Sequence, residues 1–236
     1  MTKKEDNTWI AAQTWKNLLF AHYPVTYEEI RPLVPDCFSL DLYKNQAWVS
    51  IVPFLMTGIR LKYLPTLPFT PSFPELNLRT YITYEGEPGV YFFTMDAESK
   101  AAVAMAKIYN MPYLYAKMSY GIKNSVVEFK SERIDSRAKK GVFKATYQGM
   151  GDTYLAEPGS LEYWLTQRFL FFLENKGQVI GGRIRHRQWP LQKANVTIHE
   201  NSLGESVGIT LSKEPEIVGY CKEIHAVNWL PKRIGP

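Results

Sequence analysis

The sequence predicts a mainly antiparallel β fold of the α+β class, with about ten strands closed or nearly closed into a barrel beside two or three short helices. Polar and apolar residues alternate in many short runs, and a period of two is typical of strands. These runs do not alternate regularly with helical patterns, so a parallel Rossmann-type sheet is disfavoured. Aromatic residues, which favour strands, make up 14% of the chain.

The chain has 236 residues and contains no internal repeat, linker or low-complexity tract, so we expect a single domain over residues 1–236. A net charge of +5 is mild and does not by itself indicate nucleic-acid binding. Cys37 and Cys221 do not form a disulfide framework. The sequence shows neither a signal peptide nor an apolar run long enough for a membrane helix. We therefore expect a soluble, reduced, cytoplasmic protein with no membrane partner.

The N-terminal part contains one ambiguous element and several clear ones. Residues 9–19 fit a helix or a strand, whereas residues 20–25 are extended because Pro24 disfavours a helical residue before it. Thr26 can cap a short helix over residues 27–33. Residues 40–43 and 47–56 are predicted to form a hairpin, whose second strand is nearly all apolar and buried.

A proline-rich loop covers residues 58–74 and is either a cover over a binding site or a rigid, packed crossover. Ser160 is a good N-cap for the clearest helix of the chain, which we expect to end at residues 175–177. Further strands are predicted near residues 126–133 and 142–149. Others are expected near residues 194–200, 206–212 and 216–230.

The most informative stretch is residues 72–118, which reads as strand, turn, strand, helix and strand. In its first strand, one face carries ionisable side chains and the other is apolar. Asp96 can cap a helix over residues 97–108. If the ionisable face lines a barrel interior, Glu75, Arg79, Tyr113 and Lys117 could converge in a pocket. If it faces water, as in many antiparallel sheets, they are surface residues.

Arginines alternate at positions 183, 185 and 187 of another predicted strand. They could bind phosphates or carboxylates, but such a row is more often a solvated edge. No phosphate-binding or dinucleotide-binding glycine pattern is present. The four histidines are scattered without metal-ligand spacing, so we expect neither a metal nor a cofactor.

Five stretches give the chain a strong resemblance to the YqjF-like family of uncharacterised proteins. They follow the family order and span nearly the whole chain: residues 15–25, 47–60, 73–93, 158–169 and 186–194. Two positions depart from the family pattern, in which Glu usually stands at the position of Gln167 and Tyr at that of Phe169.

The family is more distantly similar to the acetoacetate decarboxylase-like superfamily, which implies an antiparallel β cone or barrel around a buried pocket, and a homo-oligomer. Residues 75–114 carry this resemblance. The matching positions are Glu75, Tyr84-Glu85-Gly86, Met95-Asp96, Ala106-Lys107-Ile108 and Pro112-Tyr113-Leu114.

The resemblance fails at the residue that the decarboxylase mechanism requires. That mechanism uses the first lysine after the proline as an amine nucleophile that forms an imine, and its pKa must be lowered for this purpose. Tyr113 and Leu114 occupy the two lysine positions here, and neither side chain can form an imine. Lys117 is on the same face but about 13 Å further along the strand. We therefore do not expect acetoacetate decarboxylation.

Three hypotheses of function follow. The first is an enzyme acting on a small carboxylate or carbonyl compound, with Glu75 as general acid or base and Lys117 as a second catalytic candidate. The second is a non-catalytic barrel that binds or senses a small ligand in the same pocket. The third, which the mild charge disfavours, is nucleic-acid binding through residues 183–187. The candidate substrate-binding residues are His22, Arg79, Tyr113, Tyr115, Arg168, His186 and Gln192.

Overall fold

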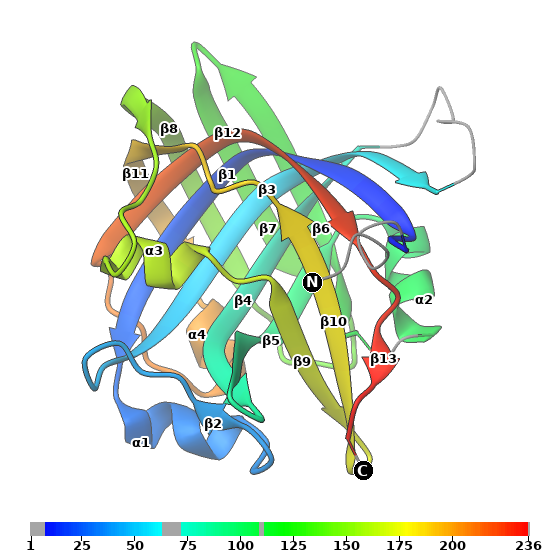
Figure 1. Ribbon diagram of the computed structural model, residues 1–236. Helices are drawn as coiled ribbons and strands as arrows, with labels where there is room; N and C mark the ends of the chain where they lie inside the picture. The colour runs from blue at the N-terminus through cyan, green and yellow to red at the C-terminus, as the bar shows by residue number, and fades with distance from the viewer. Residues whose placement is uncertain (1–7, 63–71, 109–110, 236) are drawn as a thin grey trace.

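Residues 8–62, 72–108 and 111–235 are described in the computed structural model of the chain. They form one 13-stranded sheet that folds back on itself, with short helices around it (Figure 1). The strands are β1 (Ala11–Val25), β2 (Ser39–Leu40), β3 (Ala47–Leu61), β4 (Phe73–Tyr84), β5 (Glu87–Ala97), β6 (Tyr113–Lys123), β7 (Val126–Arg133), β8 (Val142–Tyr154), β9 (Leu170–Asn175), β10 (Gln178–His186), β11 (Leu191–Asn201), β12 (Ile217–Asn228) and β13 (Lys232–Arg233).

The centre of the fold is a curved five-stranded wall in the order β12-β1-β3-β4-β5. Both faces of the wall are buried. Residues 18–23 of β1 and 47–54 of β3 are buried without interruption, and continuous apolar runs are typical of strands covered on both sides. Of the ambiguous residues 9–19, those from Ala11 onwards belong to strand β1. An irregularity in the pairing of β1 with β3 lies between Lys16 and Ala21.

The outer strands of the wall each pair with two different neighbours. One part of β12 pairs with β11 through Gln192 and Tyr220, and another part pairs with β10 through His186 and Ala226. In the same way β5 pairs with β6 near its end and with β9 at Val90. The sheet therefore closes over both faces of the wall, which confirms the predicted closed, mainly antiparallel β fold.

The two faces have different contents. Strands β6, β7, β8 and β11 cover one face, where aromatic and aliphatic side chains of the wall pack against Phe129, Phe143 and Tyr147. Strands β9 and β10 cover the other face, which encloses a cavity. The helices are α1 (Tyr27–Ile30), which η2 (Arg31–Leu33) continues, α2 (Lys100–Ile108), α3 (Leu161–Thr166) and α4 (Leu203–Val207). None of the described helices is long and apolar enough to cross a membrane.

Local capping rules gave a correct start for two helices. Thr26 and Glu29 form a reciprocal capping box on α1, and Ser160 accepts a hydrogen bond from the backbone N–H of Tyr163 at the start of α3. Asp96, in contrast, does not cap α2. It belongs to β5 and is fully buried, and the Ser99 hydroxyl instead accepts a hydrogen bond from the N–H of Ala102.

Tertiary pairing changed three other predicted elements. The helix expected from Ser160 ends at Thr166, because residues 170–175 form β9 and pair with β10. Residues 203–207 form helix α4 rather than the strand predicted over 206–212. The short strand β2 pairs with β4 and not with β3, so the hairpin predicted over residues 40–56 is reduced to an isolated antiparallel bridge between Tyr43 and Gln46. Most of the proline-rich loop lies outside the described residues.

Candidate functional site

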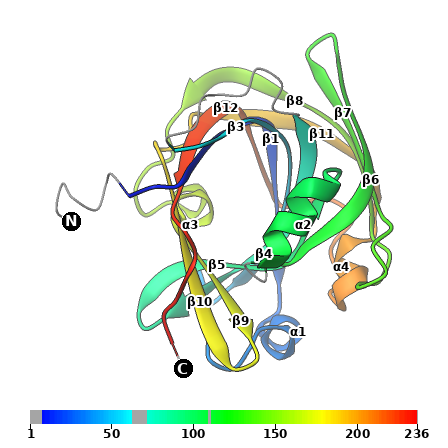
Figure 2. The same cartoon turned by 90° about the vertical axis from the view of Figure 1, so that its right-hand side faces the viewer.

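A cavity of about 300 Å³ lies between the wall and strands β9 and β10. Helix α2 lies across one end of the barrel (Figure 2) and contributes Ala102, Met105 and Ala106 to the lining. Most of the lining is apolar. Its aromatic members are Trp15, Phe20, Phe54, Phe73, Phe92, Tyr113, Phe169, Phe171, Trp189 and Trp229.

Strand β4 brings polar side chains into the cavity. Glu75, Asn77 and Arg79 line it from alternate positions, while Leu76 and Leu78 point into the core on the opposite face of the wall. The ionisable face of this strand therefore faces an interior and not water, because β9 and β10 cover it. The sequence pattern left these two arrangements open.

Glu75 is 1% exposed and lies next to Tyr113, whose hydroxyl donates to Oε2 over 3.0 Å. Burial raises the pKa of Glu75 to about 7, while hydrogen bonds from Tyr113 and Asn77 act in the opposite direction. Burial and the neighbouring carboxylate raise the pKa of Tyr113 well above its usual value. The Tyr113 phenol therefore stays protonated, and the Glu75 carboxyl can give or accept a proton near neutral pH.

Two guanidinium groups meet on the ring of Tyr81. The Cζ atom of Arg79 is 6.0 Å from the ring centroid and that of Arg168 is 5.1 Å from it. Arg168 is anchored, since its Nη1 donates to Asp41 over 2.6 Å and its Nε donates to the carbonyl of Trp164 over 2.8 Å. Two cations and one paired carboxylate leave this part of the site positively charged.

His186 lines the cavity near these arginines. Its Nδ1 is 2.6 Å from the carbonyl oxygen of Arg187, and a carbonyl can only accept, so Nδ1 carries a proton. Burial lowers the pKa of His186, and the charge of Arg79 lowers it further, whereas backbone hydrogen bonds raise it. The ring is therefore neutral at pH 7.

His22 is buried but does not line the cavity. Its Nδ1 is 2.6 Å from the hydroxyl of Ser50, which is in turn 2.6 Å from the hydroxyl of Tyr81. Burial lowers the pKa of His22 to about 3, with a smaller contribution from the charge of Arg79. His22 therefore supports Tyr81, on which the two guanidinium groups rest.

Several buried polar atoms in this lining have no hydrogen-bond partner among the described residues. Buried polar groups in folded proteins are nearly always paired, so such a concentration in one cavity points to partners on a bound molecule or on water. The atoms are Trp15 Nε1, Asn77 Oδ1, Arg79 Nε and Nη2, Arg168 Nη2 and Asn228 Oδ1.

Besides His22, three residues proposed from the sequence lie outside the cavity lining. Lys117 is exposed and pairs across β6 and β7 with Glu132, Tyr115 packs under Lys100 at 5.2 Å, and Gln192 donates to the Gly151 carbonyl over 2.7 Å. None of the three lines the cavity. Beyond its first residues β6 covers the opposite face of the wall, so the side of β6 that carries Lys117 faces outwards.

The arginines of β10 also face away from the cavity. Ile184 and His186, which alternate with them along the strand, line it. Arg183 is 6.0 Å from the ring of Trp229, and Arg185 and Arg187 are exposed. Among the described residues, no group of three or more His, Cys, Asp or Glu side chains is placed to hold a metal ion.

Sequence reasoning missed Trp15, Gln13 and Asn228, which line the cavity from β1 and β12. It also missed Asn77, although this residue had a local signal, since it lies between Glu75 and Arg79 in the alternating strand. The other three lie in the first part of β1 and at the end of β12, far in sequence from Glu75 and Arg79, and only tertiary pairing brings them to the cavity.

Comparison with known proteins identifies the family. A model of uncharacterised conserved proteins, DUF2071, matches residues 12–225. The chain belongs to the DUF2071 family. It is also 39% identical over 225 residues to the uncharacterised protein YqjF of Bacillus subtilis (strain 168), covering 95% of this chain and 92% of that protein.

Solved structures share the fold at low sequence identity. A structure of acetoacetate decarboxylase has a TM-score of 0.64 at 11% identity, covering 99% of this chain and 94% of its own. The enduracididine biosynthesis enzyme MppR complexed with pyruvate has a TM-score of 0.63 at 10% identity, covering 94% of this chain and 90% of its own. At such identities the comparison shows the fold alone. Together with the family match, it confirms the resemblance inferred from the sequence.

Proposed function

We propose that the cavity binds a small compound carrying a carboxylate or a similar anionic group, and that Glu75 exchanges a proton with a carbonyl or hydroxyl group of that compound. The observation that carries this proposal is the pair Arg79 and Arg168. Their guanidinium groups share one aromatic ring inside a mostly apolar cavity, and buried nitrogens of both lack a hydrogen-bond partner among the described residues.

An anion is the partner that suits these nitrogens best. A buried cation without a counter-ion is costly, and a carboxylate can accept parallel hydrogen bonds from a guanidinium group while neutralising its charge. Asp41 already pairs with Arg168, which leaves Arg79 as the cation available to a ligand. The enzyme MppR, whose fold is similar, was solved with pyruvate, and this supports a carboxylate ligand here.

The chemistry proposed for Glu75 is general acid–base catalysis. A carboxyl whose pKa is raised to about 7 populates both protonation states at neutral pH. None of the described lining residues is a lysine, and Tyr113 occupies the position that the decarboxylase resemblance assigns to the nucleophile. Imine chemistry therefore does not form part of the proposal.

A thermal-shift screen tests the binding step. The probes are 2-oxo, 3-oxo and hydroxy carboxylates, each beside its neutral methyl ester. We expect carboxylates to raise the melting temperature, because only the native state binds them. The esters lack the anionic group and should have little effect. Arg79→Met should remove the shift, while Lys117→Met, at an exposed position outside the cavity, should retain it. Equal shifts in both variants would refute the proposed anion site.

A non-catalytic binding protein is the second candidate, and the absence of lysine and cysteine from the described lining favours it. The two functions differ in turnover. Each compound found in the screen is incubated with wild type and with Glu75→Gln, and its proton NMR spectrum is followed in D₂O. Proton exchange or product formation that requires Glu75 supports the enzyme. Binding without any change in the compound supports the binding protein.

A further inference from the structure

We infer that the ligand is a two-ended molecule, with an anionic group at one end, an apolar body in the middle and a carbonyl or hydroxyl group at the other end. This inference rests on the proposed function and names the class of compound that the same site takes. It follows from where the polar side chains lie, from what separates them and from the size of the cavity.

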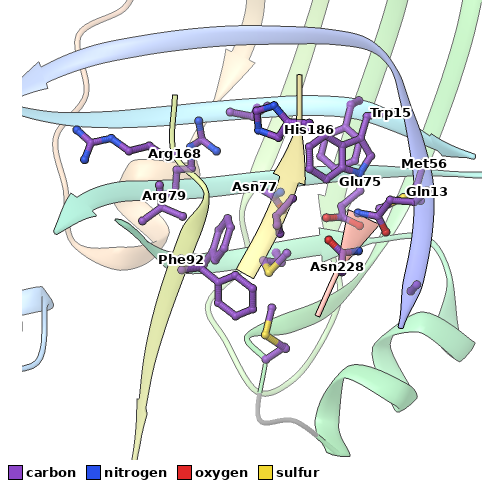
Figure 3. A pocket seen from close by; sticks show the side chains of 18 of the residues that line it. Gln13, Trp15, Met56, Glu75, Asn77, Arg79, Phe92, Arg168, His186 and Asn228 are labelled. Carbon is purple, nitrogen blue, oxygen red and sulfur yellow. The ribbon is translucent and has the colours of Figure 1, made fainter. Parts of the chain in front are cut away.

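The polar side chains lie at two separate ends. Figure 3 shows Arg79 and Arg168 towards one end of the cavity and Glu75, Gln13 and Asn228 towards the other. Residues 75 and 79 of β4 are four positions apart, so their Cα atoms are separated by roughly 13 Å along the strand. A ligand must therefore extend along β4 if it is to contact both the arginines and the Glu75 carboxyl.

The space between the two ends is bounded mainly by rings. Trp15 stacks on Trp189 with centroids 5.8 Å apart and packs against Phe54 at 5.9 Å. Phe92 lines the cavity from β5. Asn77 is the one polar side chain that β4 places between Glu75 and Arg79. A charged group in this region would lose its water and find only two unpaired neutral atoms, Trp15 Nε1 and Asn77 Oδ1, so the body of the ligand is mainly apolar.

The smallest keto acids are too small to fill the cavity. A cavity of about 300 Å³ falls within the range of pockets that bury drug-sized ligands. Pyruvate is much smaller than such a ligand and could satisfy only one end. A compound with an apolar chain or ring between its end groups fills the cavity and reaches both.

The far end offers both a donor and acceptors to the ligand. Protonated Glu75 can donate to a carbonyl oxygen, and Oδ1 of Asn228 is buried without a partner among the described residues. A carbonyl therefore pairs with the acid form of Glu75, while a hydroxyl can also donate to Asn228. A plain alkyl end would leave these groups unpaired.

Isothermal titration calorimetry with two homologous series tests the inference. One series is 3-oxobutanoate, 5-oxohexanoate, 7-oxooctanoate and 9-oxodecanoate, and the other is the alkanoates of the same lengths. We expect affinity to rise by about tenfold or more from 3-oxobutanoate to the best longer compound, because added methylenes are buried. We also expect the longer oxo acids to bind several-fold more tightly than their alkanoates.

Two variants locate the end groups. Arg79→Met should lower the affinity for all compounds by a similar factor, since every one carries the carboxylate. Glu75→Leu should remove the preference for long oxo acids over their alkanoates and leave the affinity for 3-oxobutanoate unchanged. Should Glu75→Leu not fold, the wild type supplies the same test, because the oxo preference should decrease as pH rises through about 7 and Glu75 ionises.

The outcomes separate this inference from the proposed function. If 3-oxobutanoate binds best and depends on Arg79, the anion site stands and the two-ended ligand is wrong. If the oxo preference is independent of both Glu75 and pH, the assignment of the far end is wrong. If no carboxylate of any length binds, the proposed function itself fails.

Discussion

Arg133 and Arg79 are both arginines of the sheet with buried guanidinium nitrogens, and they differ in whether the protein supplies their partners. Arg133 is fully buried and donates to both oxygens of Asp96, to the hydroxyls of Thr94 and Ser206 and to the Lys139 carbonyl. Arg79 has two buried nitrogens without a partner among the described residues.

The difference separates a structural charge from a binding charge. The partners of Arg133 come from β5, from the loop between β7 and β8, and from α4, so its guanidinium ties β7 to these elements. The nitrogens of Arg79 face a cavity in which Glu75, the nearest carboxyl on the same face of its strand, lies two strand positions beyond Asn77. Folding alone therefore supplies the hydrogen-bond partners of Arg133, whereas partners for Arg79 would have to come from a ligand.

The largest expected effect comes from breaking the structural pair. Asp96→Ala leaves the Arg133 charge buried without its counter-ion, and we expect the free energy of unfolding to fall by about 3–5 kcal/mol. Urea denaturation of wild type and variant measures this. The double variant Asp96→Leu/Arg133→Met removes both charges and should recover much of the loss. A double variant as unstable as Asp96→Ala would show that burial of the charge is not the cause.

Glu75 should make stability depend on pH at the cavity. Its pKa is about 7 in the folded protein against 4.5 ordinarily, so the folded state holds the proton more tightly. The stabilisation is fully present below pH 4.5 and is lost as pH rises through 7, by about 3 kcal/mol in all. Urea denaturation from pH 5 to 8 should show this loss in wild type relative to Glu75→Gln. Parallel curves would mean that the carboxyl is not desolvated.

His22 should act in the opposite direction over a neighbouring pH range. Its pKa is lowered from 6.5 to about 3, so its stabilisation is present above pH 6.5 and is lost as pH falls. Between pH 7 and 5 the loss should be about 2 kcal/mol in wild type and absent in His22→Gln. Thermal unfolding of the two proteins in matched buffers is the measurement. An equal loss in His22→Gln would assign the acid sensitivity to other groups.

The smallest expected effect has the opposite sign to that of Asp96→Ala. Arg79→Met removes a cation with unpaired buried nitrogens, and we expect the free energy of unfolding in the absence of ligand to rise by about 1 kcal/mol. The measurement is urea denaturation, with Lys117→Met as the exposed control. A clear loss of stability in Arg79→Met would show that the protein itself pairs this guanidinium, and the contrast with Arg133 would disappear.

Much of the candidate site could be anticipated from the alternation in one strand. Glu75 and Arg79 share a face because strand side chains alternate, and Tyr113 was placed with them by the resumed alternation after the helix. His186 and Arg168 were named as candidates, and the structure places both in the lining. Lys117 was placed on the right face of β6 relative to Tyr113, but β6 leaves the cavity before Lys117 is reached.

The sequence by itself determined the β class, the capped starts of α1 and α3, and the family. These properties depend on local patterns and on residue identity. Only the tertiary structure decided that β9 and β10 cover the polar face of β4, that residues 170–175 are strand, and that Asp96 pairs with Arg133. Each depends on contacts between residues far apart in the chain, and a side chain's chemistry alone does not say which partner folding will bring to it.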